Sequence, residues 1–218
     1  MKIHNKSTAT LLDSMGDDLR VANVARVSFN KWKSEMDPSD ARLIHYLAKH
    51  HHWTPFSHVM VTLRIEAPIF IARQWFKSQM GVTRNEMSRR YVDDAPEFYI
   101  PDEFHARPEK GIKQGSGEVH DATSHMSVLA LGLAYRNLGN YEGLIEGGLA
   151  PEEARMFLPQ NTMTAWVETG SLAYYARVCK LRLDSHAQRG IQQLAAEVAS
   201  IVENVAPVSW AALMGESK

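Results

Sequence analysis

The sequence contains one cysteine, no long apolar run and almost no net charge. A single thiol, Cys179, excludes a disulfide framework within the chain and is typical of a reducing compartment. A bilayer-spanning helix needs about 18 apolar residues in a row, which the sequence lacks, and residues 1–19 hold no apolar core of a signal peptide. We therefore expect a cytoplasmic protein that has no membrane partner.

Charge is balanced over the whole chain but concentrated in one segment. With 24 Lys and Arg against 25 Asp and Glu, the chain has no general attraction for nucleic acid, so any anion site must be local. The sequence also lacks the glycine-rich phosphate loops of dinucleotide-binding and Walker-type proteins. Residues 73–91, RQWFKSQMGVTRNEMSRRY, are the exception, with five Lys and Arg residues and one acid.

A length of 218 residues allows one domain or a compact pair, and we expect a single domain over residues 1–218. Strands mixed with several helices indicate the α+β class. Val59, Val61, Leu63 and Ile65 recur at every second position, which predicts a strand with one buried face. An Asp-Pro pair at 37–38 predicts the start of a helix. Further helices are predicted over 68–79, 121–148, 151–159, 171–183 and 185–206, extended segments over 97–101 and 161–170, and a surface loop over 106–120.

The side chains of residues 73–91 suit a nucleotide. An arginine fork can hold a phosphate through two N–H donors, and the Gln74 amide can pair with the amide edge of a pyrimidine. Two other interpretations fit the same residues. One is a solvated basic segment in which Glu86 pairs with an arginine. The other is a single-strand nucleic-acid site in which Trp75, Phe76 and Tyr91 stack bases, although the chain lacks the extended basic surface of such proteins.

Histidines and the cysteine supply no clear metal or nucleophile site. His50, His51 and His52 are consecutive, so their imidazoles point in different directions, and we expect no metal centre. Cys179 lies within a predicted helix between Val178 and Lys180, with no base nearby to activate it. We interpret it as a small buried thiol.

The junction between the last two predicted long helices carries Arg182, Asp184, Ser185 and His186. A helix N-terminus at this point favours an anion through its dipole. Alternatively, Asp184 and Ser185 only cap the helix, with Ser185 at the cap position, and His186 lies on the surface. The residues leave both interpretations open.

Along most of its length the chain resembles the flavin-dependent thymidylate synthases. The matching blocks are VANVARVSFN, HHWTPFSHVMVTLRIEAPIFIARQWF, NEMSRRY, EFYIP, EEARMFLP and LRLDSHAQRGIQQ, in the family's order. The resemblance implies an α+β fold with a twisted antiparallel sheet, assembled as a homotetramer whose active sites lie between subunits. It implies FAD as cofactor, which NADPH reduces, and transfer of a one-carbon unit from methylenetetrahydrofolate to C5 of dUMP, without a cysteine nucleophile.

The resemblance also assigns roles to residues. It implies that Arg182, Ser88 and His52 belong to the catalytic site, with Arg182 near the uracil edge, Ser88 in a positioning role and His52 as an active-site imidazole. Residues implied to bind dUMP are Gln74, Lys77, Glu86, Met87, Ser88, Arg89, Arg90, Arg155 and Arg182. Residues implied to bind FAD are Ser28, Thr54, Ser57, Lys77, Ser78, Gln79, Arg177 and His186.

The chain departs from the family signature, which is Arg-His-Arg, seven residues and a serine. Aligned on RQWF, it has Lys77, Ser78 and Gln79 at the signature positions, with eight residues before Ser88, so the loop through Gly81 is one residue longer. Two cations and an imidazole have become one cation and two neutral polar groups, and lysine does not reproduce an arginine fork.

Other substitutions lie in segments that resemble FAD-binding ones. Ser57 replaces a glutamate of TPFEH, and Ala173 replaces an arginine that often contacts FAD. We expect a gained Arg177 to offset the change at 173. The charge lost from the signature should matter to flavin or phosphate binding unless Arg84, inside the longer loop, supplies it. These changes leave two alternatives open: hydroxymethylation of dUMP or a related pyrimidine nucleotide, and nucleotide or nucleic-acid binding without turnover on the same scaffold.

Overall fold

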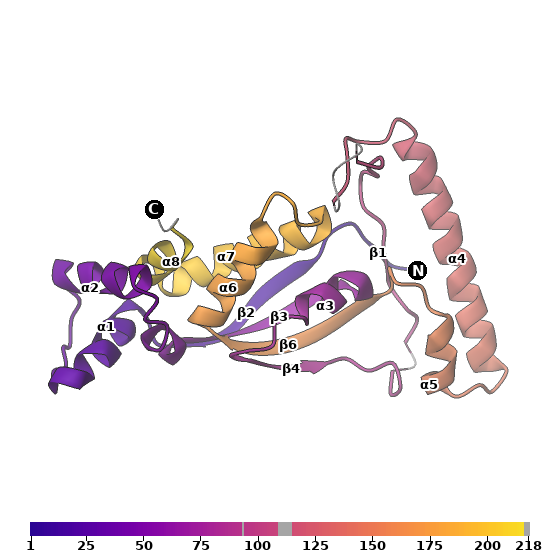
Figure 1. Ribbon diagram of the computed structural model, residues 1–218. Helices are drawn as coiled ribbons and strands as arrows, with labels where there is room; N and C mark the ends of the chain where they lie inside the picture. Colours follow the sequence, from indigo (N-terminus) through magenta and orange to yellow (C-terminus); the bar gives the residue numbers. More distant parts are fainter. Residues whose placement is uncertain (93, 109–114, 216–218) are drawn as a thin grey trace.

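The computed structural model describes residues 1–92, 94–108 and 115–215 (Figure 1). Its strands are β1 (Ile3–His4), β2 (Thr8–Met15), β3 (Met60–Pro68), β4 (Val82–Glu86), β5 (Phe98–Tyr99) and β6 (Met163–Ser171). Its α-helices are α1 (Asp18–Arg26), α2 (Pro38–Lys49), α3 (Ile69–Trp75), α4 (Thr123–Glu146), α5 (Pro151–Ala154), α6 (Leu172–Leu183), α7 (Arg189–Val205) and α8 (Pro207–Met214). Three 3₁₀ turns complete the described elements: η1 (Val27–Phe29), η2 (Pro55–His58) and η3 (Arg155–Phe157).

A four-stranded antiparallel sheet in the order β2-β3-β6-β4 forms the centre of the molecule. The pairing of β3 with β6 runs unbroken from Met60 opposite Ser171 to Pro68 opposite Met163. A short parallel pair, β1 with β5, lies outside this sheet, so the predicted strand in 97–101 is present. The α+β class and the antiparallel sheet are therefore confirmed.

One face of the sheet is covered by helices, and α6 and α7 run along it (Figure 1). The side chains of β3 that the sequence predicted to face inward, Val61, Leu63 and Ile65, are fully buried there. Buried residues of α7 (Ile191, Leu194, Ala195, Val198 and Val202) join them in the main core. Arg64 on the opposite face of β3 is exposed, so the strand follows the two-residue alternation of a half-covered sheet.

Most predicted helices are present with the expected termini. Asp37 accepts from the backbone N–H of Ser39 (2.7 Å) and forms a capping box with Asp40, while Pro38 opens α2. Among the described helices, none combines the length and apolar character needed to cross a bilayer. The structure pairs His105 with Val119 at the base of the predicted 106–120 loop, of which residues 109–114 lie outside the described residues.

Two details of the predicted elements were wrong, and one strand was not predicted. The helix predicted over 68–79 ends at Trp75, and residues 82–86 form the unpredicted strand β4. The β-branched Val82 and Thr83 disfavour a helix and pair well with the open edge of β6. Ser185 does not cap the last long helix, which begins at Arg189 after Gln188.

The remaining helices extend the molecule in two directions. α1 and α2 lie at one end, whereas α4 and α5 stand at the other (Figure 1). Asp18 at the start of α1 is 7% exposed and connects the α1–α2 end of the molecule to the core. Its carboxylate accepts from the backbone N–H groups of Val208 (2.9 Å) and Ser209 (2.7 Å) in the first turn of α8. An acid thus satisfies helix N–H groups that have no partner within α8.

We expect Asp18→Ala to lower the free energy of unfolding by about 1–3 kcal/mol, because two buried N–H groups lose their acceptor. Urea unfolding followed by circular dichroism measures this change. Glu35→Ala, which removes an exposed carboxylate, is the control and should unfold at the wild-type midpoint. Equal midpoints for the two variants would show that the α1–α8 contact contributes little.

Candidate functional site

A pocket of about 390 Å³ opens beside the C-terminal end of β4. We call it the β4 pocket. Glu86 is the last residue of β4, and the chain then turns through residues 87–90 along the pocket wall. The other wall comes from η3, which carries Arg155. Its lining residues are Ile69, Glu86, Met87, Ser88, Arg89, Arg90, Arg155, Leu158, Thr162, Met163 and Thr164.

The guanidinium groups of the β4 pocket keep most of their donors for a ligand. Among the described residues, Arg89, Arg90 and Arg155 form no ion pair with a carboxylate. Arg155 Nε donates to the Glu152 carbonyl (3.1 Å), and Arg90 Nε donates to Ser88 Oγ (3.1 Å). Three cations without counter-ions in one small pocket favour a phosphate.

The carboxylate of Glu86 in the β4 pocket is held in place by a side chain of the neighbouring strand β6. Thr164 Oγ1 on β6 donates to Glu86 Oε1 (2.7 Å), so Glu86 does not pair with a neighbouring arginine as the solvated-segment interpretation required. Thr162 also lines the pocket, and its buried hydroxyl has no hydrogen-bond partner among the described residues. The pocket therefore combines cations with oriented polar groups that suit the sugar or base of a nucleotide.

Arg182 and Gln74 meet at a second position, where α3, α6 and α7 converge. Arg182 Nη2 donates to the Gln74 carbonyl (2.7 Å), and the Gln74 side-chain amide contacts that of Gln188. Arg182 Nε is buried and has no partner among the described residues. Helix α3 links the two positions, because Ile69 at its start lines the β4 pocket and Gln74 lies in its last turn.

Lys77, Ser78 and Gln79 lie in the loop between α3 and β4, and not within the helix that the sequence predicted over 68–79. Lys77 and Gln79 are exposed. Arg177 on α6 adjoins this loop, because its Nη2 donates to the Met80 carbonyl (2.6 Å).

Arg84 does not supply the charge lost from the signature, because it is paired inside the protein. Its side chain is only 13% exposed, and its Nε donates to the fully buried carboxylate of Glu168 (2.7 Å). A guanidinium neutralised by a buried acid is not available to a flavin or a phosphate. Sequence reasoning missed Glu168, whose inward position follows from its alternation with Trp166 and its register opposite Arg84.

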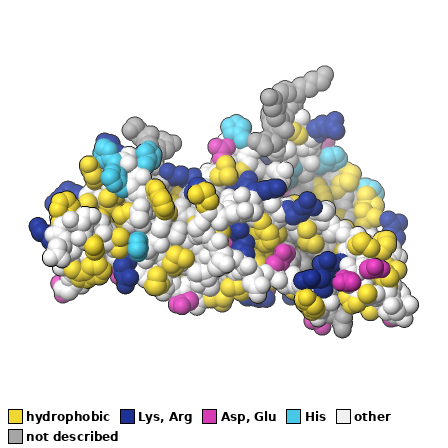
Figure 2. All heavy atoms as spheres, turned by 60° about the horizontal axis from the view of Figure 1, so that its bottom comes forward, with side chains coloured by type: hydrophobic (Ala, Val, Ile, Leu, Met, Phe, Trp, Pro, Cys, Tyr) yellow, Lys and Arg dark blue, Asp and Glu magenta, His cyan; other side chains and the backbone are white. Residues whose placement is uncertain are grey.

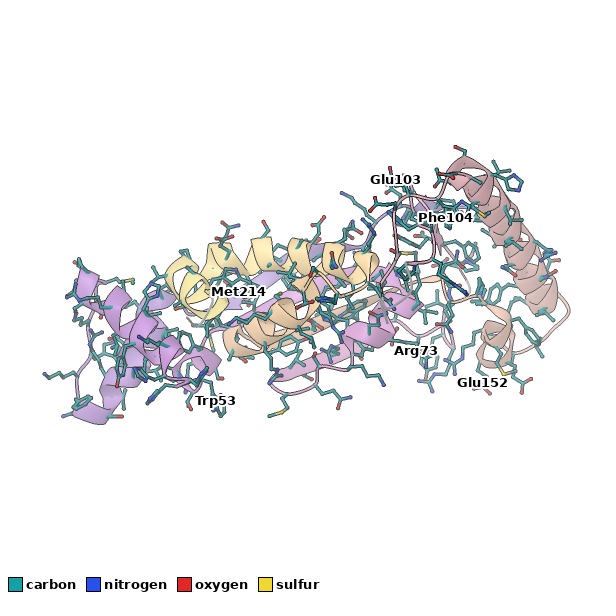
Figure 3. All side chains as sticks on the ribbon, turned by 45° about the horizontal axis from the view of Figure 1, so that its top comes forward. Trp53, Arg73, Glu103, Phe104, Glu152 and Met214 are labelled. Carbon is teal, nitrogen blue, oxygen red and sulfur yellow. The ribbon has the colours of Figure 1, made fainter. Side chains whose placement is uncertain are left out.

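The other predicted FAD residues lie toward the α1–α2 end of the chain. Ser28 belongs to η1, while Thr54 and Ser57 begin and line the turn η2. Trp53 at this end and Glu152 on α5 lie far apart in Figure 3. One chain therefore does not bring Ser28 and Thr54 to the β4 pocket.

His52 lies at the same end, in a cavity of about 550 Å³ that is also lined by His45, Lys49, His51 and Lys180. Figure 2 shows histidine side chains gathered at this end of the molecule. Within the described residues no group of three or more potential metal ligands occurs.

His186 and Cys179 have opposite surroundings. His186 is exposed, and its Nδ1 lies 2.9 Å from Asp184 Oδ1; this hydrogen bond and one from the His186 backbone N–H hold the pKa of Asp184 below its usual value. Cys179 is fully buried, and burial raises the pKa of its thiol to about 12. A thiol in this state is not a nucleophile near neutral pH, which agrees with the interpretation of Cys179 as a core residue.

The predicted FAD residues have the chemistry that a dinucleotide needs. Lys77 and Arg177 supply cations for a diphosphate, and the loop also offers the hydroxyl of Ser78 and the amide of Gln79. Lys77 forms no ion pair among the described residues. This donor set fits a flavin dinucleotide despite the changed signature.

Known proteins resemble the chain over nearly its whole length. Residues 10–208 match the family described as thymidylate synthase complementing protein. A flavin-dependent thymidylate synthase of Thermosipho africanus is 39% identical over 220 residues, which cover 98% of this chain and 93% of that protein. One from Thermus thermophilus is 36% identical, covering 95% and 76%.

A solved structure is similar in fold as well as in sequence. The UMP/dUMP methylase PolB from Streptomyces cacaoi, in its crystal structure with 5-Br dUMP, superposes with a TM-score of 0.87 at 27% identity, covering 97% of this chain and 96% of that one. Taken with the family match and the curated relatives, this similarity places the chain in the flavin-dependent thymidylate synthase family.

Proposed function

We propose that this protein is an FAD-dependent thymidylate synthase that converts dUMP to dTMP. Methylenetetrahydrofolate provides the one-carbon unit, and NADPH provides the two electrons that reduce it from the methylene to the methyl level. The products are dTMP, tetrahydrofolate and NADP⁺. The observation that carries the proposal is the β4 pocket. It holds Arg90 and Arg155 together with Ser88 and Glu86, and neither arginine forms an ion pair among the described residues.

Within this proposal the β4 pocket binds the nucleotide. Arg90 and Arg155 hold the 5′-phosphate, and the Ser88 hydroxyl completes its hydrogen bonds, which gives Ser88 a positioning role. Glu86 is fixed by Thr164, so its second oxygen is available to a sugar hydroxyl or a base N–H. Arg89 and Met87 complete the wall of the pocket.

Arg182 and Gln74 serve the uracil ring. A cation at a uracil carbonyl stabilises the negative charge that develops there as C5 becomes nucleophilic. The Arg182 guanidinium is already oriented by the Gln74 carbonyl, so little freedom is lost when it acts.

The flavin would be held by the loop after α3 together with α6 and the 3₁₀ turns. The loop and α6 contribute Lys77, Ser78, Gln79 and Arg177, and His186 follows Arg182 closely in sequence. The 3₁₀ turns contribute Ser28, Thr54 and Ser57, and His52 provides an imidazole beside them. When bound, FAD supplies hydride chemistry that no side chain can supply.

Assembly as a homotetramer explains two features of the chain. The predicted FAD residues Ser28 and Thr54 lie at the opposite end from the β4 pocket, so a complete site needs a second copy to bring them together. Helix α4 also leaves large apolar side chains exposed: Val128 (71%), Leu129 (52%), Leu131 (39%), Leu133 (40%) and Tyr135 (58%). Such a surface is typical of an interface between subunits.

Methylation of UMP is a second candidate, because the similar PolB structures carry 5-Br UMP as well as 5-Br dUMP. Mass spectrometry after incubation with each nucleotide separates the candidates. It also separates a methylated from a hydroxymethylated product, which differ by one oxygen.

We expect the purified protein to bind FAD, and the bound flavin to bleach under anaerobic NADPH faster when dUMP is present. Absorbance spectroscopy in a stopped-flow instrument measures both steps. UMP in place of dUMP is the matched comparison. A protein that takes up no FAD when the cofactor is supplied in excess would contradict the proposed function.

Arg182→Ala should lower kcat by about 10²–10³-fold, as expected when one donor to a developing negative charge is removed. Steady-state turnover with product detection measures the loss, and circular dichroism checks that the variant is folded. Arg42→Ala, which removes an exposed arginine of α2, is the control and should retain wild-type turnover. Near-normal turnover of the Arg182 variant would remove that residue from the uracil site.

The double variant Val128→Glu/Tyr135→Glu should dissociate the assembly, because the interface would then have to bury carboxylates. Light scattering after size-exclusion chromatography measures the mass. Both side chains are already exposed in the single chain, so the fold should be kept. Asn140→Glu adds charge at an exposed polar position of the same helix and should leave the mass unchanged. A monomeric wild-type protein would contradict the tetramer.

A further inference from the structure

A buried ion pair fastens β4 to the centre of the sheet. Arg84 and Glu168 are directly opposite in the β4–β6 register, and Arg84 Nε donates to Glu168 Oε2 at 2.7 Å. Glu168 is fully buried, and the Arg84 side chain is 13% exposed. Removing one partner of such a pair leaves an uncompensated charge in the core, so the two residues depend on each other.

The carboxylate of Glu168 is satisfied from the core side as well. Trp75 Nε1 donates to Oε2 at 3.0 Å, and Trp166 Nε1 donates to the same oxygen at 3.0 Å. The guanidinium of Arg84 lies against the rings of Phe76 and Tyr174, with its carbon 5.1 Å and 5.6 Å from their centroids. These contacts therefore fix the position of the Arg84 guanidinium on the sides that face the core.

A second nitrogen of the Arg84 guanidinium contacts both helix α6 and the loop that replaces the family signature. Arg84 Nη2 donates to the Ser78 carbonyl (2.7 Å) and to the Tyr174 hydroxyl (2.5 Å). Arg84 thus joins the buried carboxylate of Glu168 to the backbone of the 77–81 loop through a single guanidinium. A lysine could pair with Glu168 but could not bridge all three partners.

Two further contacts hold the same loop. Arg177 Nη2 donates to the Met80 carbonyl (2.6 Å), and the Ser171 backbone N–H donates to the Gly81 carbonyl (2.9 Å). Gly81 has a φ of +82°, which favours glycine, and a Cβ there would meet Ser171 Oγ at 3.1 Å. With the Ser78, Met80 and Gly81 carbonyls fixed, the Lys77 and Gln79 side chains are left exposed.

We propose that Arg84 and Glu168 are positioning residues that set the conformation of the 77–81 loop, and that the FAD affinity of the protein depends on them. The second part of this inference rests on the proposed function. Arg84 acts through the backbone that carries Lys77, Ser78 and Gln79, and it does not touch the cofactor itself. The alternative is that the pair only stabilises the core.

The double variant Arg84→Met/Glu168→Gln separates the two roles. It removes both charges together, and the amide oxygen of the new glutamine side chain still accepts from indole N–H groups, so the thermal midpoint should stay near that of the wild type. The Ser78 carbonyl, however, loses its donor. Amide hydrogen exchange of residues 77–83 should become faster, and the FAD dissociation constant should rise about ten- to a hundredfold, as when contacts that orient ligand-binding groups are lost.

The matched control is Arg26→Met/Asp40→Asn, which removes a pair of similar burial (15% and 0% exposed side chains) at the other end of the molecule. It should leave the exchange of residues 77–83 unchanged. Arg84→Lys is the second variant if the double variant does not fold, and it should also speed exchange of the loop because lysine cannot reach all of the partners of Arg84.

Wild-type exchange in the loop together with wild-type FAD affinity, in either Arg84 variant, would overturn the inference. Faster exchange with unchanged FAD affinity would also overturn it, because the loop would be fastened by Arg84 without consequence for the cofactor. A wild-type protein that binds no FAD would instead refute the proposed function, and the exchange measurement would still decide whether Arg84 sets the loop.

Discussion

The pairing of β3 with β6 is the constraint on which the candidate site depends. Each strand passes into a helix without a connecting loop, β3 into α3 at Ile69 and β6 into α6 at Leu172. Because the strands are antiparallel, the two helices start at opposite ends of the sheet and run toward each other. Their C-terminal turns therefore meet, which brings Arg182 to the Gln74 carbonyl.

Arginines in this chain have two distinct functions that the amino-acid composition does not separate. Arg84 and Arg26 are nearly buried and paired with fully buried acids, so their charges stabilise local structure. Arg90 and Arg155 face a pocket and use N–H donors on neutral oxygens. Only the second kind can bind an anion, so a near-neutral chain still forms a strongly cationic pocket.

The sequence predicted the α+β class, the central strand and most helices, because alternation and three-and-four spacing report one-sided burial directly. It did not predict β4, since residues 82–86 become a strand only through the open edge of β6. The same strand pairing decides the role of Arg84, which the sequence left open. A basic residue in a polar segment looks solvent-exposed until the register places Glu168 opposite it. The grouping of Glu86, Ser88, Arg90 and Arg155 came from the family resemblance and not from periodicity, since Arg155 lies far from the others in sequence.

The changed signature can be understood from these contacts. In the flavin site that we propose, a loop with one cation in place of two offers fewer charges to a dinucleotide, so polar groups with fixed positions gain importance. Arg84, Arg177 and Ser171 fix three carbonyls of the loop from the protein side. Pre-organisation reduces the entropy lost on binding, and in this way it can offset part of the missing electrostatic attraction. The buried pair that removed Arg84 from the set of ligand-binding cations is thus what allows the remaining polar groups of the loop to act from a fixed backbone.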